Sequence, residues 1–429
     1  MKTYIYPKKQ LWKSLAERPL INNKQLNPII GRILRNVEVN GDKALFDYTK
    51  KFDNVQLKDL KVSPLEFEKA ESKTANKLKT AIELAYQNIY AFHKEQKQNN
   101  RKVETTQGVK CWRKAVGIER VGIYIPAGEA PLFSSVLMLG IPAILAKCKR
   151  IILCTPVQND GTVNSTILYT AKRIGIKNIY KVGGAQAIGA MAYGTTTIPR
   201  VDKIFGPGNQ YVTKAKELIQ QSGTAIDLPA GPSEVLVIAD KTANPSFVAA
   251  DLLSQAEHGQ DSQVMLVSTS NLIIKKVLTE LTAQLKILPR RKIVEKALYN
   301  SKAIKFKSIN ECVEFSNLYA PEHLIIATRD PENISENIVN AGSVFLGNYS
   351  CESAGDYASG TNHTLPTNGF ARNYSGVSLD SFTKKITFQK ITKQGLLNIG
   401  ESIEIMAQAE QLQAHKNAVS IRLKTISNE

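Results

Sequence analysis

The amino-acid sequence predicts an α/β protein with two parallel-sheet domains and small helical segments at both ends of the chain. From Arg120 onward, short apolar runs alternate with helical patterns, which is typical of parallel sheets covered by helices. The alternation occurs in two successive series, which indicates two similar domains with a cleft between them. Loops rich in glycine and proline punctuate the series at 126–128, 183–184, 206–208 and 230–233. Because ligands of open parallel sheets bind outside the carboxyl ends of the strands, we expect the ligand site there.

The elements follow from the pattern in chain order. Residues 1–20 show little periodicity and predict an arm or a short helix pair, and residues 27–97 show helical periodicity. The first series predicts strands at 121–125, 151–154, 179–182 and 203–205, with helices at 165–174, 185–193 and 210–221. The second predicts strands at 234–239, 263–267, 324–327 and 343–346, with helices at 246–258 and 272–285. After Asp380 an apolar face at helical spacing predicts a helical tail.

These patterns predict four parts of the chain. Residues 1–20 form an N-terminal arm, and residues 381–429 form a C-terminal helical tail that can reach a partner subunit. The first α/β domain combines 21–120 with 234–380, and the second spans 121–233.

Composition narrows the class of protein. Hydrophobic residues make up 43% and charged residues 22% of the 429 residues, which is ordinary for a soluble globular protein. The five cysteines are odd in number and widely spread, which excludes a disulfide framework and favours a reducing compartment. No secretory signal is visible, and the apolar stretch 131–146 is interrupted by Gly140 and Pro142 and too short to span a bilayer. We therefore expect a cytoplasmic protein without membrane contact.

The charge balance is strongly basic. Lysine and arginine number 56 against 38 aspartates and glutamates, which gives a net charge of +18. The lysines are scattered along 43–110 and 275–307 and form no zinc-finger or aromatic RNA-binding motif. The sequence therefore predicts no nucleic-acid partner, and the basic excess has no explanation in the motifs.

Gln255 and His258 lie three residues apart in a predicted helix and therefore share one face. An amide oxygen and an imidazole on one face can bind a divalent metal. The same spacing also suits a histidine that interacts with the carboxyl end of the helix dipole. The spacing leaves both interpretations open.

Glu322 and His323 stand at the mouth of a predicted strand. Neighbours on a strand face opposite ways, so both can serve one site only if the loop at Pro321 turns them inward. A carboxylate beside an imidazole is suited to proton removal near neutral pH. A polar pair at a strand edge is the alternative.

Other polar residues give weaker signals. Asp356 is surrounded by small residues, with His363 seven positions further on, and Glu410 and His415 end the tail helix. His93 lies on a charged helix face and is expected to be solvated. The run Phe205–Asn209 lacks the third glycine of a dinucleotide-binding fingerprint, so a nicotinamide cofactor would bind by other contacts.

Nine segments occur together in order between about Val121 and Val419, with weaker similarity toward the N-terminus. They are VGIYIPAG, VGGAQAI, DKIFGPGN, IDLPAGPSEVLVIAD, DLLSQAEHG, YAPEHL, GSVFLG, ESAGDYASGTNH and AHKNAV. This series resembles the histidinol dehydrogenase family. The resemblance implies two incomplete Rossmann-like domains similar to the aldehyde dehydrogenase-like superfamily. It also implies the oxidation of L-histidinol to L-histidine through L-histidinaldehyde with two NAD⁺, the last step of histidine biosynthesis.

The resemblance also implies roles for particular residues, carried over motif by motif. One zinc ion per subunit of a homodimer would be held by Gln255, His258, Asp356 and the partner chain's copy of His415. Substrate contacts would come from Ser233, Gln255, His258, His323, Asp356, Glu410 and His415. NAD contacts would come from Tyr124, Gln186 and Asn209. His323 would act as general base, and Glu322 would activate water.

Three alternatives remain open. A cysteine-dependent aldehyde dehydrogenase would use Cys154 as its nucleophile, although this residue also fits a small buried hydrophobe. A zinc amide hydrolase would need no nicotinamide. A non-enzymatic basic protein would bind DNA in a salt-sensitive way and hold no stoichiometric metal.

Overall fold

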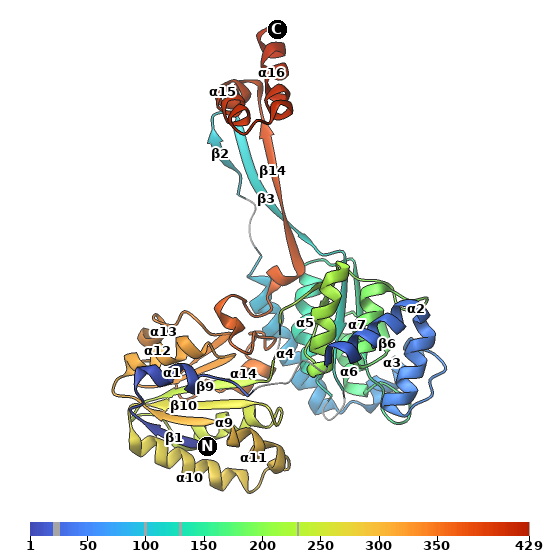
Figure 1. Cartoon of the computed structure of the whole chain (residues 1–429). Helices are drawn as coiled ribbons and strands as arrows, with labels where there is room; N and C mark the ends of the chain where they lie inside the picture. Colours follow the sequence, from blue (N-terminus) through green and yellow to red (C-terminus); the bar gives the residue numbers. More distant parts are fainter. Residues whose placement is uncertain (20–25, 98–100, 128–130, 230, 429) are drawn as a thin grey trace.

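The computed structural model describes residues 1–19, 26–97, 101–127, 131–229 and 231–428. Figure 1 shows two α/β bodies side by side, with a long thin arm that rises away from both. We name the bodies after their sheets, as the five-stranded unit and the six-stranded unit. The predicted segment 21–25 and the loop positions 128 and 230 lie outside the described residues.

The five-stranded unit is a parallel sheet in the order β6-β5-β4-β7-β8. Its strands are β4 (Arg120–Tyr124), β5 (Arg150–Thr155), β6 (Asn178–Lys181), β7 (Lys203–Phe205) and β8 (Ala225–Ile226). Its helices are α5 (Phe133–Leu145), α6 (Ser165–Arg173), α7 (Gly184–Tyr193) and α8 (Gln210–Ile219), followed by the 3-10 turn η3 (Gln220–Ser222). Three helices from the N-terminal part, α2 (Leu26–Asp53), α3 (Pro64–Lys73) and α4 (Asn76–Lys94), pack against α7, α6 and α5 respectively.

The six-stranded unit is a parallel sheet in the order β1-β11-β10-β9-β12-β13. Its strands are β1 (Lys2–Ile5), β9 (Glu234–Ala239), β10 (Gln263–Ser268), β11 (Lys302–Lys305), β12 (His323–Ala327) and β13 (Ser343–Leu346). Its helices are α1 (Trp12–Leu15), α9 (Pro245–Ala256), α10 (Asn271–Leu285), α11 (Arg291–Tyr299), α12 (Ile309–Tyr319), α13 (Pro331–Ser335) and α14 (Glu352–Tyr357), with the turn η1 (Lys9–Leu11) before α1. Every residue of β9, β10 and β12 is buried, as expected for central strands covered on both faces.

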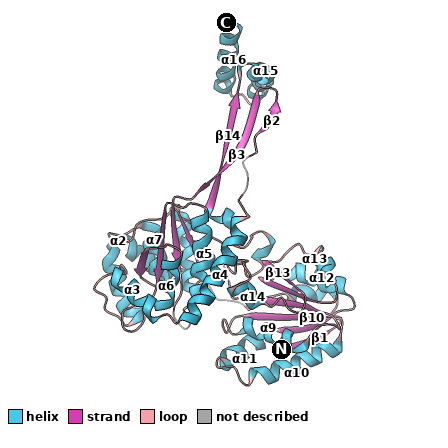
Figure 2. Ribbon diagram, turned by 180° about the vertical axis from the view of Figure 1, so that it is seen from behind, coloured by secondary structure: helices cyan, strands magenta, loops and turns pink. Residues whose placement is uncertain are grey.

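The arm is a three-stranded antiparallel sheet in the order β14-β3-β2. Its strands are β2 (Val103–Thr106), β3 (Val109–Gly117) and β14 (Thr383–Ile391), and its tip carries α15 (Lys393–Ala409) and α16 (Gln413–Ser427). The turns η4 (Phe370–Arg372) and η5 (Leu379–Phe382) lead into β14. Figure 2 shows the same arm from behind, with α15 and α16 far from both bodies.

The α/β class and the two parallel sheets are confirmed, and the predicted strands 203–205, 234–239 and 343–346 match β7, β9 and β13. The domain boundaries differ from the prediction. The helices of 26–94 pack on helices of the five-stranded unit instead of joining 234–380, and 103–117 belong to the arm. Periodicity reveals the apolar face of a helix but not the sheet that covers it.

The chain termini also differ from the prediction. Residues 1–20, expected as an arm, supply the edge strand β1 and the buried Trp12. The tail 381–429, expected as helical, begins with the nine-residue strand β14, whose partner β3 lies far away in the sequence. In the part of the chain that the structure describes, no helix is both long enough and apolar enough to cross a membrane.

Candidate functional site

The candidate site lies at one edge of the six-stranded sheet, where β9 and β12 begin. His323 is the first residue of β12, and Ser233 directly precedes β9 and accepts a hydrogen bond from Gln263 N at 3.1 Å. The helix α9 follows β9 and returns along the sheet, so its last turn brings Gln255 and the following His258 to the same edge. The candidate residues therefore lie at the amino ends of these strands, whereas the sequence predicted a ligand site at the carboxyl ends.

Glu322 and His323 are both buried and turn toward each other. Ala320 ends α12 with a left-handed φ of 53°, and the chain reverses there before Pro321. His323 Nδ1 lies 3.5 Å from Glu322 Oε2 and 3.2 Å from the carbonyl oxygen of Glu234. The loop thus meets the condition that the sequence set for a shared site.

One oxygen of Glu322 is held by two donors. Glu322 Oε2 accepts hydrogen bonds from the backbone N–H of Glu234 at 2.8 Å and from Gln255 Nε2 at 3.2 Å. These contacts fix the carboxylate beside the His323 ring. They also turn the amide oxygen of Gln255 away from Glu322, and that oxygen is buried without a hydrogen-bond partner.

Asp356 lies between two imidazoles. Its Oδ1 is 3.8 Å from His323 Nε2, and its Oδ2 is 4.0 Å from His258 Nε2. Potential ligand atoms of His258, Glu352 and Asp356 all lie within 4.8 Å of one another. Together with the unpartnered oxygens of Gln255 and Glu352, this mixed set of nitrogen and oxygen atoms fits a divalent cation such as zinc.

The carboxyl groups of this cluster resist ionisation. Burial raises the pKa of Asp356, and burial together with the Asp356 charge raises the pKa of Glu352 to about 7. On α9, burial and the charge of Glu352 raise the pKa of Asp251 to about 7. Several buried acids in close contact are a setting that a bound cation stabilises.

The two buried histidines of the site have opposite electrostatic settings. Burial alone would lower the pKa of His323, but the carboxylates led by Glu322 outweigh it and raise that pKa to about 9. Burial lowers the pKa of His363 to about 4, and this ring is therefore neutral at pH 7. His363 contacts the carbonyl oxygen of Asp356 at 3.0 Å through Nδ1, which leaves Nε2 for Ser135 Oγ at 3.0 Å.

Contacts of Asn362 and His363 connect the site to the five-stranded unit. Ser135 belongs to α5, and Asn362 Nδ2 donates to the carbonyl oxygen of Met138 in the same helix at 2.6 Å. In α4, His93 Nε2 lies 3.3 Å from Asn362 Nδ2, and His93 Nδ1 lies 2.9 Å from the carbonyl oxygen of Ile89. His93 is fully buried, so the expectation of a solvated histidine was wrong.

The predicted cofactor residues lie at the carboxyl edge of the five-stranded sheet, as parallel-sheet topology predicts. Tyr124 ends β4, and its hydroxyl accepts a hydrogen bond from Gly184 N at 3.0 Å, beside Gln186 in α7. Burial raises the pKa of Tyr124 to about 12. Asn209 caps α8, where its side-chain oxygen accepts from Tyr211 N at 3.0 Å.

Two predicted residues do not reach the cluster in this chain. Glu410 ends α15 and His415 lies in α16, both exposed at the tip of the arm (Figure 1). Of the four predicted metal ligands, His258 and Asp356 thus lie in one cluster, and Gln255 contacts Glu322 at the same edge of the sheet. Sequence reasoning missed Glu352, although it lies four residues before Asp356, a spacing that places both on one face of α14.

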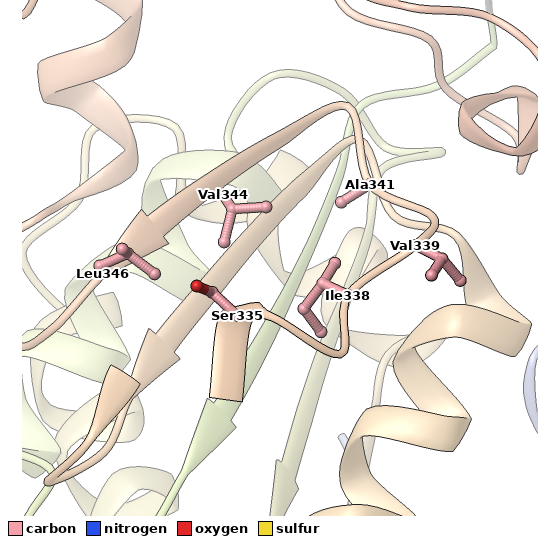
Figure 3. A pocket seen from close by; sticks show the side chains of 6 residues that line it. All are labelled: Ser335, Ile338, Val339, Ala341, Val344 and Leu346. Carbon is pink, nitrogen blue, oxygen red and sulfur yellow. The ribbon is translucent and has the colours of Figure 1, made fainter. Parts of the chain in front are cut away.

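Two surface cavities lie elsewhere. One of about 310 Å³ sits at the edge strand β13, lined by Ser335, Ile338, Val339, Ala341, Val344 and Leu346 (Figure 3). The other, of about 550 Å³, lies along α2 and is lined by Pro28, Gly31, Arg32, Arg35, Asn36, Val39 and Asn40. Neither lining includes a candidate site residue.

The cysteine alternative finds no support. Cys154 lies in the central strand β5 with no exposed surface, and burial raises the pKa of its thiol. A cysteine nucleophile must be ionised to the thiolate and must be accessible to the substrate, and Cys154 meets neither condition.

Fold and site together define a two-unit α/β enzyme with a buried carboxylate–imidazole pair beside a cluster suited to a divalent metal. The family model for histidinol dehydrogenase matches residues 16–423, and the chain therefore belongs to the histidinol dehydrogenase family.

Individual relatives agree over nearly the whole chain. The histidinol dehydrogenase of Bacteroides thetaiotaomicron is 55% identical and covers 99% of this chain and 100% of its own length. That of Haemophilus influenzae is 50% identical over 97% of this chain and 99% of its own. The crystal structure of histidinol dehydrogenase from Elizabethkingia anophelis is 60% identical, with a TM-score of 0.98 over 100% of this chain and 99% of that one.

More distant structures add nothing about function. An acetylating aldehyde dehydrogenase from Geobacillus thermoglucosidasius covers 89% of this chain and 94% of its own at 14% identity, with a TM-score of 0.48. A structural similarity with this identity and TM-score supports no inference about the function of the chain.

Proposed function

We propose that the chain catalyses the NAD-dependent, four-electron oxidation of L-histidinol to L-histidine through L-histidinaldehyde, the final step of histidine biosynthesis. Family membership supports this reaction. The observation that carries the site assignment is the convergence of the buried Glu322, His323 and Gln255 with Asp356 and the exposed His258 at one edge of the six-stranded sheet.

Zinc is the metal that the donor set favours, with one ion per subunit. Gln255, His258 and Asp356 would hold it, and the metal would provide a partner for the side-chain oxygen of Gln255, which is buried without a hydrogen bond. When bound, zinc orients the amino alcohol through its nitrogen donors, and NAD⁺ accepts a hydride in each of two oxidations.

His323 is the general base of the first oxidation. Its Nδ1 faces the carbonyl oxygen of Glu234 and the Glu322 carboxylate, so Nε2 is the nitrogen that faces Asp356 and the substrate. Because the neighbouring carboxylates raise the pKa of His323 to about 9, the ring acts as a base only in its neutral form. In that form the Nδ1–H tautomer leaves Nε2 free to take the proton of the substrate hydroxyl while hydride leaves the carbon that bears this hydroxyl.

Glu322 supports the second oxidation. Its carboxylate takes a proton from the water that adds to the aldehyde carbon, while His323 returns the proton of the first oxidation to the aldehyde oxygen, which gives the diol. The neutral His323 ring then takes the proton of one diol hydroxyl as the second hydride leaves, and the carboxylic acid that results loses its proton to water. Two NADH are therefore formed per histidinol, and the intermediate aldehyde stays in the site throughout.

The remaining contacts are assigned by position. Ser233, at the mouth of β9, would contact the substrate together with His323, and Tyr124, Gln186 and Asn209 would contact NAD from the facing unit. We propose that the glycine-rich loops at the carboxyl edge of the five-stranded sheet bind the cofactor in place of a dinucleotide-binding fingerprint.

We propose a homodimer in which the arm of one subunit completes the site of the other. Glu410 and His415 lie exposed at the arm tip, and Ile405, Met406 and Ile421 expose 62%, 66% and 63% of their surface there. Apolar groups exposed on a projecting element are typical of a contact with another chain. A cytoplasmic location is proposed because all five cysteines are free.

The test is the amount of NADH formed per L-histidinol consumed, with and without a chelator. The expected result is two NADH per substrate, loss of turnover on chelation and recovery on addition of zinc. Ammonia released from small amides without NADH would favour an amide hydrolase instead.

A further inference from the structure

One arginine of the N-terminal segment, Arg18, contacts residues that neighbour the candidate site. The backbone of residues 1–19 is fixed on the six-stranded unit by β1, by the buried Trp12 and by Lys302 Nζ, which donates to the carbonyl oxygen of Leu15 at 2.8 Å. Gln263 Nε2 donates to the carbonyl oxygen of Glu17 at 3.3 Å. Arg18 is thereby directed into the interior from an anchored chain.

Arg18 forms a two-pronged ion pair with Glu234. Its Nε and Nη2 donate to Glu234 Oε1 and Oε2 at 2.5 and 2.8 Å, and only 2% of the Glu234 side chain is exposed. A planar guanidinium matches a carboxylate in this geometry, which lysine cannot reproduce. The pair therefore sets the position of Glu234, the first residue of β9.

The same guanidinium holds the end of α12. Arg18 Nη2 also donates to the carbonyl oxygens of Tyr319 at 2.7 Å and Ala320 at 3.3 Å, and the guanidinium lies 4.1 Å from the centre of the Tyr319 ring. Ala320 is the left-handed residue two positions before Glu322. One side chain thus connects the start of β9 to the loop that carries the catalytic pair.

Glu234 transmits this position to the catalytic pair through its backbone. Its N–H donates to Glu322 Oε2 at 2.8 Å, and its carbonyl oxygen lies 3.2 Å from His323 Nδ1. Its carboxylate also accepts from Asn368 N at 2.8 Å, which holds the 367–369 loop over the segment that carries Ser233. Arg18 thus fixes the side chain of Glu234, and the main chain of Glu234 orients Glu322 and His323.

From these contacts we propose that Arg18 is a positioning residue for the dehydrogenase reaction, acting through Glu234 to hold Glu322 and His323 in their reactive geometry. The inference rests on the proposed function, because the pair must be catalytic for its position to matter. Arg18 itself touches neither reacting group. A displacement of about 1 Å in a catalytic group costs about a hundredfold in rate, so a loose clamp lowers kcat.

The experiment compares four variants of the full-length, zinc-loaded enzyme. R18K keeps a cation opposite Glu234 but loses the fork, and kcat for histidinol is expected to fall about tenfold with the KM for NAD⁺ unchanged. R18M is expected to lose about a hundredfold in kcat and also thermal stability, since it leaves a buried carboxylate unpaired. Zinc content should stay at the wild-type level in both.

The double variant R18M/E234Q separates position from stability. It removes both charges, so its melting temperature should return toward that of the wild type while kcat stays low. The matched control is K9M, because Lys9 pairs with Glu314 of α12 from the same N-terminal segment at 2.6 Å, but on the surface. K9M should keep full activity.

Two results would overturn the inference: a kcat for R18K within twofold of the wild type, or a double variant whose kcat recovers together with its stability. A wild-type enzyme that forms no NADH from histidinol would overturn the proposed function, and this inference with it.

Discussion

At the scale of single residues, the sequence predicted the candidate pair Glu322 and His323 and most of the candidate metal cluster, but not the residues that contact them. Glu322 and His323 are neighbours, and Gln255 and His258 share a helix end, so short spacings made them candidates, while their proposed roles rest on the family resemblance. Arg18 and Glu234 are 216 positions apart, and no local pattern connects them. Such partners become visible only when β1 and β9 lie in one sheet.

Replacing His323 by asparagine tests the general base. His323→Asn is expected to lower kcat by at least about a thousandfold, because the carboxamide cannot accept a proton. Zinc content should not change, since Gln255, His258 and Asp356 are intact. Steady-state rates and elemental analysis measure the two quantities, and near-normal turnover in this variant would refute the role.

His93 predicts a pH dependence of stability away from the site. Burial lowers the pKa of His93, so the folded protein binds fewer protons than the unfolded chain below the ordinary histidine pKa of 6.5. The stabilisation is complete above that pH and is lost as the pH falls toward the folded pKa. The slope is at most ~1.4 kcal/mol per pH unit.

The measurement is urea unfolding of the wild type and His93→Gln at several pH values between 5 and 7.5. The variant cannot titrate at this position, so its stability should fall less steeply as the pH is lowered. Equal slopes for the two proteins would show that His93 makes no such contribution.

At the scale of elements, central strands were predictable and edge strands were not. The strands β9 and β10 are apolar runs buried on both faces, so their boundaries followed from the sequence. The strands β1 and β14 are mostly exposed and carry lysines, and only their pairing partners make them strands. Exposed strands leave no run of apolar residues to detect.

The loop between β7 and α8 gives a test of the cofactor assignment. Gly206 has a φ of 133°, and a Cβ there would lie 2.0 Å from the carbonyl oxygen of Tyr124. Gly206→Ala must therefore displace either the loop or the end of β4, both of which carry proposed NAD contacts.

The expected result for Gly206→Ala is a KM for NAD⁺ at least about tenfold higher, with zinc content unchanged. The control is Gly175→Ala, also a left-handed glycine of this unit, where the Cβ would meet no atom within 4 Å. An unchanged KM in a folded Gly206→Ala enzyme would contradict the placement of NAD at this edge.

At the scale of the whole molecule, the arm separates two predicted residues from the site they are expected to serve. No periodicity or spacing in one chain reports on a partner, so the shared site rests on family resemblance and on the exposed arm tip. The boundary between the two units was mispredicted for a related reason, since α2, α3 and α4 pack on helices of a unit that follows them in the chain.

Mixing two inactive variants tests the shared site. His415→Ala and Asp356→Ala chains should each be inactive alone, because each removes a metal ligand. A mixed dimer restores one intact site, so random reassortment should regenerate about a quarter of wild-type activity. The mixture is assayed after the chains have exchanged, and absent activity in confirmed mixed dimers would place each site within one chain.

The most direct test of a zinc-dependent histidinol oxidation is a titration of metal-free enzyme with zinc, with the rate of NADH formation from L-histidinol followed against bound metal. If zinc is required at one site per chain, the rate rises linearly from no turnover to a plateau at one ion per chain. Full turnover by enzyme that holds no divalent metal would contradict it.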